Sequence, residues 1–82
     1  MFQLNFDKKA LEQLNRLDKI IKERIWNKLQ ESKENPNHFF EHLKDIEAYK
    51  LRIGNYRVIV DIDNNNKIIH ILKIGHRKNV YE

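Results

Sequence analysis

The fold is decided by residues 49–62, which read Tyr-Lys-Leu-Arg-Ile-Gly-Asn-Tyr-Arg-Val-Ile-Val-Asp-Ile. This pattern predicts two antiparallel strands joined by Gly54-Asn55, because glycine at the first position of a two-residue loop adopts a positive φ without strain. The loop also fixes the register of the two strands. The predicted cross-strand pairs are Ile53 with Tyr56, Arg52 with Arg57, Leu51 with Val58, and Lys50 with Ile59.

The two faces of this hairpin differ in chemistry, because side chains alternate along a strand. One face carries Lys50, Arg52 and Arg57, here called the cationic cluster. Placing Arg52 opposite Arg57 is unfavourable, since like charges on directly opposed strand residues repel. Either these side chains splay into water, or a polyanion binds this face, and we favour the second interpretation. The other face is apolar and belongs to the core, with Leu51, Ile53, Val58, Val60 and Ile62.

Composition restricts the class of protein. The chain has 82 residues, which favours one domain over residues 1–82. Its formal net charge of +4 favours an acidic partner, with nucleic acid first and an acidic protein second. The chain contains no cysteine, which excludes disulfides and thiolate zinc sites. No apolar run is long enough to span a membrane and no signal peptide is visible, so we expect a cytoplasmic protein without membrane contacts.

The first part of the chain predicts a strand followed by helix. Phe2-Gln3-Leu4-Asn5-Phe6 alternates apolar and polar residues, as in a short strand. From Lys8 to about Glu34 the chain lacks glycine and proline, and its apolar residues recur at helical spacing. Asp7 is a candidate N-cap and Asp18 is a second one. This region is therefore either one long helix or a helical hairpin.

The remaining segments complete the predicted order of elements. Asn35-Pro36-Asn37 ends the helix, because proline disfavours helical conformation in the residue before it. Residues 38–47 are expected to anchor onto the core as a loop or a short helical turn. After the hairpin, residues 63–66 form a turn and residues 67–74 form a third strand. This order predicts an α+β domain with helices on one face of a four-stranded antiparallel sheet.

The third strand extends the cationic face in the predicted register, which pairs Ile62 with Lys67, Val60 with Ile69, and Val58 with Ile71. A face that is part basic and part apolar does not stay bare in a soluble protein, so a partner is expected to cover it. The residues expected to share this face with Arg57 are Ile59, Ile68, His70, Leu72 and Ile74.

Other chemical patterns are weak. Asp61 and Asp63 flank a polar turn and are interpreted as solvated. His38 and His42 are four residues apart and could share a helix face as metal ligands, but no third ligand lies nearby. We therefore expect neither a metal nor a cofactor. The basic residues Lys19, Lys22, Arg24 and Lys28 are assigned to solvated helix faces.

The hairpin, the strand ending Ile74-Gly75-His76-Arg77 and the near-terminal Tyr81 together resemble the RelE/ParE toxin superfamily, and most closely its RelE branch. The start of the chain, Phe6-Asp7-Lys8-Lys9-Ala10-Leu11, is similar to the first strand and helix of that family. The resemblance covers essentially the whole chain. Its hairpin and Gly-x-Arg ending are more specific to the superfamily than to the branch.

This resemblance implies a helical hairpin packed on the sheet and a toxin that cleaves mRNA in the ribosomal A site without metal. It also implies a cognate antitoxin, which we expect to be acidic and partly disordered and to wrap the toxin. By matching positions, the catalytic residues fall on Lys50, Arg52, Arg57, Arg77 and Tyr81. His76 and Lys78 are further RNA-binding candidates. The residues predicted to bind the antitoxin are Ile59, Ile68, Leu72 and Ile74.

Two departures from the family pattern stand out. Arg52 replaces the second hairpin lysine of the family, and arginine is effectively always protonated. The C-terminal helix of some members is expected to be missing here. The resemblance also leaves two alternatives open, because fold does not settle function. One is a ParE-like, non-enzymatic inhibitor of a DNA topoisomerase, and the other is a module that only binds RNA.

Overall fold

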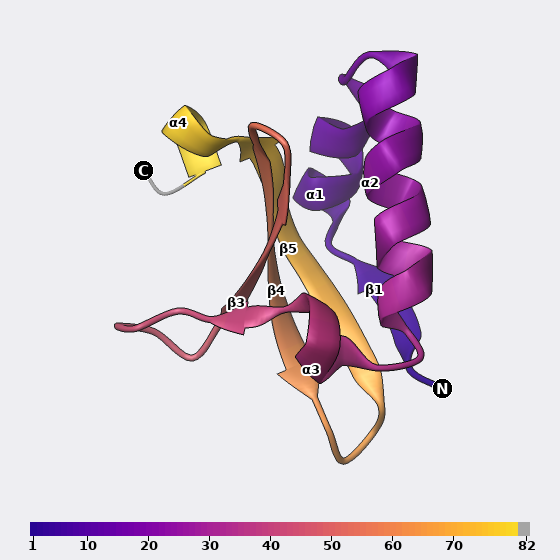
Figure 1. Ribbon diagram of the computed structural model, residues 1–82, viewed down its shortest axis with the longest axis vertical. Helices are drawn as coiled ribbons and strands as arrows, with labels where there is room; N and C mark the ends of the chain where they lie inside the picture. Colours follow the sequence, from indigo (N-terminus) through magenta and orange to yellow (C-terminus); the bar gives the residue numbers. More distant parts are fainter. Residues whose placement is uncertain (81–82) are drawn as a thin grey trace.

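The computed structural model describes the backbone of residues 1–80 and the side chains of residues 1–78. One sheet carries helices on both of its faces (Figure 1). The elements in chain order are β1 (Gln3–Phe6), α1 (Lys8–Asn15), α2 (Lys19–Ser32), α3 (Pro36–Phe39), β2 (Glu41–His42), β3 (Tyr49–Ile53), β4 (Tyr56–Asp63), β5 (Ile68–His76) and α4 (Arg77–Val80).

The sheet confirms the predicted α+β class but corrects two of its details. It has five strands in the order β1-β5-β4-β3-β2, and β1 runs parallel to β5. The additional strand is β2, which pairs with β3 through Glu41 and His42. The prediction of four antiparallel strands was wrong, because β2 is too short to give a pattern. The direction of β1 depends on pairing with a strand more than sixty residues away.

The β3–β4 hairpin has the register that its turn predicts. Arg52 pairs with Arg57, and Lys50 pairs with Ile59. Gly54 has a φ of 58°, the left-handed conformation that glycine adopts without strain. The cationic cluster therefore lies on a single face of the hairpin, as predicted.

The β4–β5 register differs from the prediction. Val60 pairs with Ile71, and Val58 pairs with Ile74, with an irregularity between Ile59 and Val60. Such a β-bulge places an extra residue in one strand and reverses the alternation beyond it. Ile74 consequently packs in the core on the helix-covered side and is 2% exposed, so its predicted place beside Arg57 was wrong.

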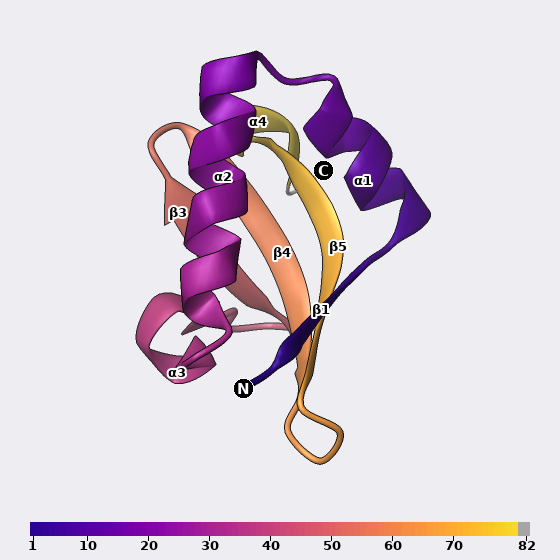
Figure 2. The ribbon, with the colours of Figure 1, turned by 90° about the vertical axis from the view of Figure 1, so that its right-hand side faces the viewer.

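The helical region is a hairpin, which resolves the alternative left open by the sequence. α1 and α2 lie on one side of the sheet, and α1 packs against β5 (Figure 2). β1 pairs with β5 only as far as Ile71, and beyond that point the Gln13 side chain accepts a hydrogen bond from the Ile74 N–H at 2.9 Å. None of the described helices is long and apolar enough to cross a bilayer.

The other side of the sheet, here called the open face, is covered only in part. α4 lies on this side, against β4 and β5 (Figure 1). Ile59 is buried there beneath Ala48 and Leu43. The face that a partner was expected to cover is thus partly covered by the chain itself. The one-turn helix α4 was not predicted.

We expect Gly54→Ala to lower the free energy of unfolding by about 1 kcal/mol, because an L-residue is strained in the left-handed region. An added Cβ would lie 3.8 Å from Arg24 Nη2, an ordinary contact, so strain rather than crowding dominates. Urea denaturation measures the change. Gly54→Asn should lower the free energy of unfolding by less than Gly54→Ala does, since asparagine tolerates the left-handed conformation better than alanine. Equal losses for both variants would contradict this explanation.

The β4–β5 turn makes part of the stability pH-dependent. Hydrogen bonds from the Asn66 side chain and from the backbone N–H groups of Asn66 and Asn65 lower the pKa of Asp63 below its ordinary value of 3.8. Because the pKa of Asp63 is lower in the folded state than in the unfolded state, its carboxylate stabilises the protein fully above the unfolded-state pKa. This contribution is lost as pH falls through the folded-state pKa. Asp63→Asn should therefore lower the melting temperature at pH 7, and the difference from wild type should shrink in acid. A constant difference across this range would contradict the assignment.

Candidate functional site

Two rows of side chains cross the open face at its α4 end. The first row contains Arg52, Arg57 and Gly75 on neighbouring strands. The second row contains Glu41, Lys50, Ile59 and Lys73, in that order from β2 to β5. Directly opposed residues in such rows have Cβ atoms about 5 Å apart. The sheet therefore brings four cationic side chains together on one surface.

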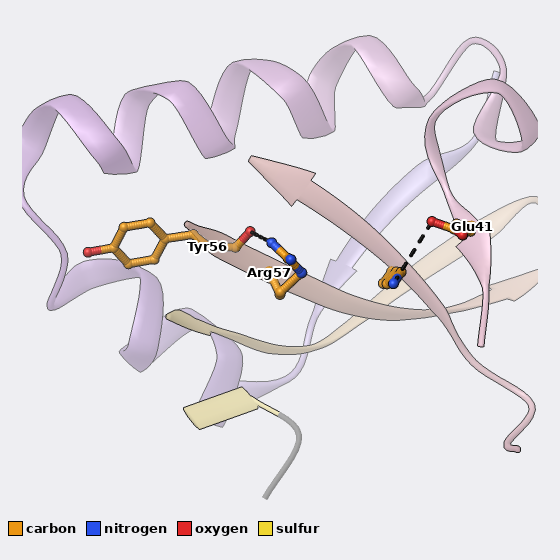
Figure 3. A network of polar contacts seen from close by, with 4 residues as sticks. Glu41, Tyr56 and Arg57 are labelled. Carbon is orange, nitrogen blue, oxygen red and sulfur yellow. Dashed lines mark hydrogen bonds and ion pairs between the residues drawn. The ribbon is translucent and has the colours of Figure 1, made fainter. Parts of the chain in front are cut away.

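Arg57 is the buried member of this group. It is only 4% exposed, whereas its register partner Arg52 is exposed. Its Nη1 donates to the carbonyl of the preceding residue, Tyr56, at 3.2 Å (Figure 3). Its Nε is buried without a hydrogen-bond partner among the described residues. A buried donor without a partner is unfavourable, so a structure built for stability alone does not explain a guanidinium at this position.

Lys50 lies in the adjacent row and has a carboxylate beside it. Its Nζ is 3.9 Å from Glu41 Oε2, and the two residues are register partners on β3 and β2 (Figure 3). The Glu41 side chain is 74% exposed, so the pair is open to solvent on its outer side. An exposed pair of this kind is weak, and an incoming anion can compete with Glu41 for the lysine.

The end of β5 and the start of α4 position the remaining predicted residues. Arg77 begins α4 two residues after Gly75, the partner of Arg57, and its N–H donates to the Asn55 carbonyl at 2.8 Å. Lys78 follows with an exposed side chain. His76 instead pairs with Tyr56, on the opposite side of the strands from Arg57. Tyr81 lies outside the described residues.

The four aliphatic residues predicted to bind a partner do not form one surface. Ile59 is buried beneath Ala48 and Leu43, and Ile74 is in the core. Ile68 is half-buried, and Leu72 is 38% exposed. Ile68 and Leu72 therefore stay available to a partner, whereas Ile59 and Ile74 do not in this conformation.

The far end of the open face has the opposite charge. A pocket of about 290 Å³ there is lined by Asn5, Asp7, Glu47, Asp61, His70 and Leu72. His70 Nδ1 is hydrogen-bonded to the Asn5 side chain at 3.0 Å, which holds the ring toward β1. The open face is thus basic at the α4 end and acidic at the other, so an anionic ligand is directed to the arginines.

The histidines considered as metal ligands do not share a helix face. α3 ends at Phe39, so His38 is helical whereas His42 lies on β2 beside Tyr49 and Glu47. Within the described part of the chain, no three His, Asp or Glu side chains gather in a way that could hold a metal ion.

The sequence missed two residues of the candidate site. Lys73 was not considered for the site. Alternation in the predicted register would turn it toward the core, and the bulge instead places it on the open face. A lysine facing the core should have indicated the bulge. Glu41 gave no such signal, because β2 consists of only two residues and its pairing is non-local.

The chain matches a family model over residues 4–81, and the description of that model is the ParE toxin of type II toxin–antitoxin systems, parDE. A putative RelE-like toxin protein of Escherichia coli is 28% identical over 80 residues, which is 94% of this chain and 84% of that protein. The mRNA interferase toxin RelE of E. coli K12 is 27% identical over 78 residues, covering 92% of this chain and 82% of the toxin.

Solved structures share the fold. A chain of the RelBE toxin–antitoxin complex from Mycobacterium tuberculosis superposes with a TM-score of 0.85 at 22% identity, covering 93% of this chain and 98% of that one. The isolated E. coli RelE toxin superposes with a TM-score of 0.81 at 22% identity, covering 93% of this chain and 84% of that one. The resemblance stated from the sequence is confirmed.

Arg57→Met should raise the free energy of unfolding by at least about 1 kcal/mol, because it replaces an unpaired buried donor with an apolar chain of similar length. The matched control is Arg52→Met, whose exposed position predicts little change. Urea denaturation measures both. Added polyphosphate should raise the melting temperature of wild type more than that of Arg57→Met. A destabilised Arg57→Met would show that the guanidinium already has its partners.

Proposed function

Because the chain belongs to the family of ParE toxins of type II toxin–antitoxin systems, we propose that this toxin is a RelE-like endoribonuclease that cleaves mRNA in the ribosomal A site. The similarity to RelE toxins named mRNA interferases supports this choice within the family. The observation that carries the proposal is the buried Arg57 guanidinium, whose Nε has no hydrogen-bond partner within residues 1–78, in a row with Arg52. A phosphodiester is the acceptor that this arrangement fits.

The proposed reaction is attack of the RNA 2′-oxygen on the adjacent phosphorus. The 2′-oxygen loses its proton, a bond to phosphorus forms, and the bond from phosphorus to the 5′-oxygen breaks. The leaving oxygen takes up a proton, which gives a 2′,3′-cyclic phosphate and a free 5′-hydroxyl. Such a transfer needs proton donors and acceptors and charge stabilisation on the phosphorane, and it does not require a metal ion.

The roles follow from position. Arg57 contributes donors at a fixed place because its strand and its contact with the Tyr56 carbonyl hold it. Arg77 starts α4 beside the same row and is the second candidate clamp on the phosphate. Lys50 lies in the next row and is the candidate for proton transfer, with Arg52 adding charge. Tyr81 stays in the proposal from the family resemblance alone.

We also propose a cognate antitoxin as the partner of this chain. Similar folds occur in RelBE toxin–antitoxin complexes, and the net charge of +4 favours an acidic partner. A partly disordered antitoxin that folds on binding could wrap the domain and contact Ile68 and Leu72 on the open face. Cleavage on ribosomes would place the toxin in the cytoplasm.

A second candidate function is ParE-like inhibition of a DNA topoisomerase without catalysis. The specific observation in its favour is the family model, whose description names ParE. The same basic open face would then bind an acidic protein surface. The two functions differ in whether RNA is cut.

We expect purified wild-type toxin to cut mRNA in the A-site codon of programmed ribosomes, and Arg57→Ala and Arg77→Ala to reduce kcat at least a hundredfold while still binding the antitoxin. Mapping of mRNA ends measures cleavage. Activity should survive chelation of zinc when ribosomal magnesium is maintained. Intact mRNA together with stalled topoisomerase would reject the nuclease in favour of the second function.

A further inference from the structure

Side chains from three different elements lie at the β3–β4 turn, on the side away from Arg57: an arginine next to Gly54, and an aromatic pair at the adjoining ends of β4 and β5. The Arg24 guanidinium of α2 reaches the turn, with Nη2 3.8 Å and Nη1 4.0 Å from the position of a Cβ on Gly54. Tyr56 on β4 and His76 on β5 are register partners, and their ring centroids are 5.5 Å apart at 75°. We call Arg24, Tyr56 and His76 the tip cluster.

The tip cluster is separate from the candidate cleavage site. Tyr56 and Arg57 are consecutive strand residues, so their side chains point to opposite faces. The Tyr56 ring extends away from the Arg57 guanidinium (Figure 3). The hairpin turn therefore has guanidinium groups on both sides, with Arg57 on the open face and Arg24 on the helix-covered face.

The members of the tip cluster keep binding capacity. Arg24 is exposed and forms no ion pair with a carboxylate of residues 1–78. His76 Nδ1 accepts a hydrogen bond from the Lys78 N–H at 3.3 Å. The neutral ring then carries its proton on Nε2, which can donate to a ligand. Both rings are half-buried, so their positions are fixed while part of each stays accessible.

We propose that the tip cluster is a second RNA contact, which holds RNA on the far side of the turn from the cleavage site. Arg24 binds a backbone phosphate, while Tyr56 and His76 contact the neighbouring nucleotide through an aromatic edge and the Nε2–H. A guanidinium and an aromatic pair at the same turn combine the two kinds of contact, to phosphate and to base, that recognise unpaired RNA. This inference rests on the proposed nuclease function. The RNA is either mRNA outside the cut codon or ribosomal RNA.

The variant Arg24→Gln tests this proposal against the matched control Lys28→Gln. Both remove one positive charge from α2, but Lys28 Nζ lies over the Phe39 ring at 5.7 Å, against α3 rather than the turn. Arg24→Gln should raise KM for programmed ribosomes about three- to tenfold and leave kcat within twofold, because one phosphate contact is lost. For this variant, the slope of the logarithm of the binding constant against the logarithm of the salt concentration should become shallower by about one phosphate contact. Lys28→Gln should match wild type.

Further measurements separate the possible outcomes. A loss of binding by Arg24→Gln on ribosomes without mRNA identifies ribosomal RNA as the ligand, and a loss confined to programmed ribosomes identifies mRNA. His76→Gln should also raise KM, and less than additively with Arg24→Gln if both contact one nucleotide. An unchanged KM overturns the proposal, as does a rise that tracks a lower melting temperature or equals that of Lys28→Gln. Absence of cleavage by wild type would instead reject the proposed function itself.

Discussion

The two-residue turn at Gly54 and Asn55 is the constraint on which the site depends. Its left-handed glycine sets the register that opposes Arg52 and Arg57. The Asn55 carbonyl accepts the Arg77 N–H, so the same turn also fixes where α4 begins. The position of the cationic groups thus follows from a few backbone contacts.

Stability and ligand binding oppose each other at Arg57. A core built only for stability would place an apolar residue at a position with 4% exposure. The buried Nε of Arg57 has no hydrogen-bond acceptor among the residues whose side chains are described. In the proposed function, a phosphate at this position would supply the missing acceptor, so part of the binding free energy would come from relieving an unfavourable state of the free protein.

Local patterns predicted most of the fold, and non-local pairing accounts for the differences. The hairpin register was correct because its turn and strands are adjacent in sequence. The bulge beyond Ile59 was not predicted, and one extra residue was enough to exchange the faces of Lys73 and Ile74. The cationic cluster was found on one face, but the burial of Arg57 was not predicted, because it comes from parts of the chain distant from the hairpin turn. Glu41 was not predicted as part of the site, because β2 is too short to be recognised from its sequence.

The hydrogen bond between Gln13 and the Ile74 N–H has a consequence for self-association. An uncovered strand edge is a template on which another chain can add a strand. β5 passes beyond the end of β1, and α1 occupies that stretch of edge with a side-chain amide in place of a sixth strand. With α1 docked, a strand from a second copy of the chain would have to displace this helix before it could pair with that part of β5.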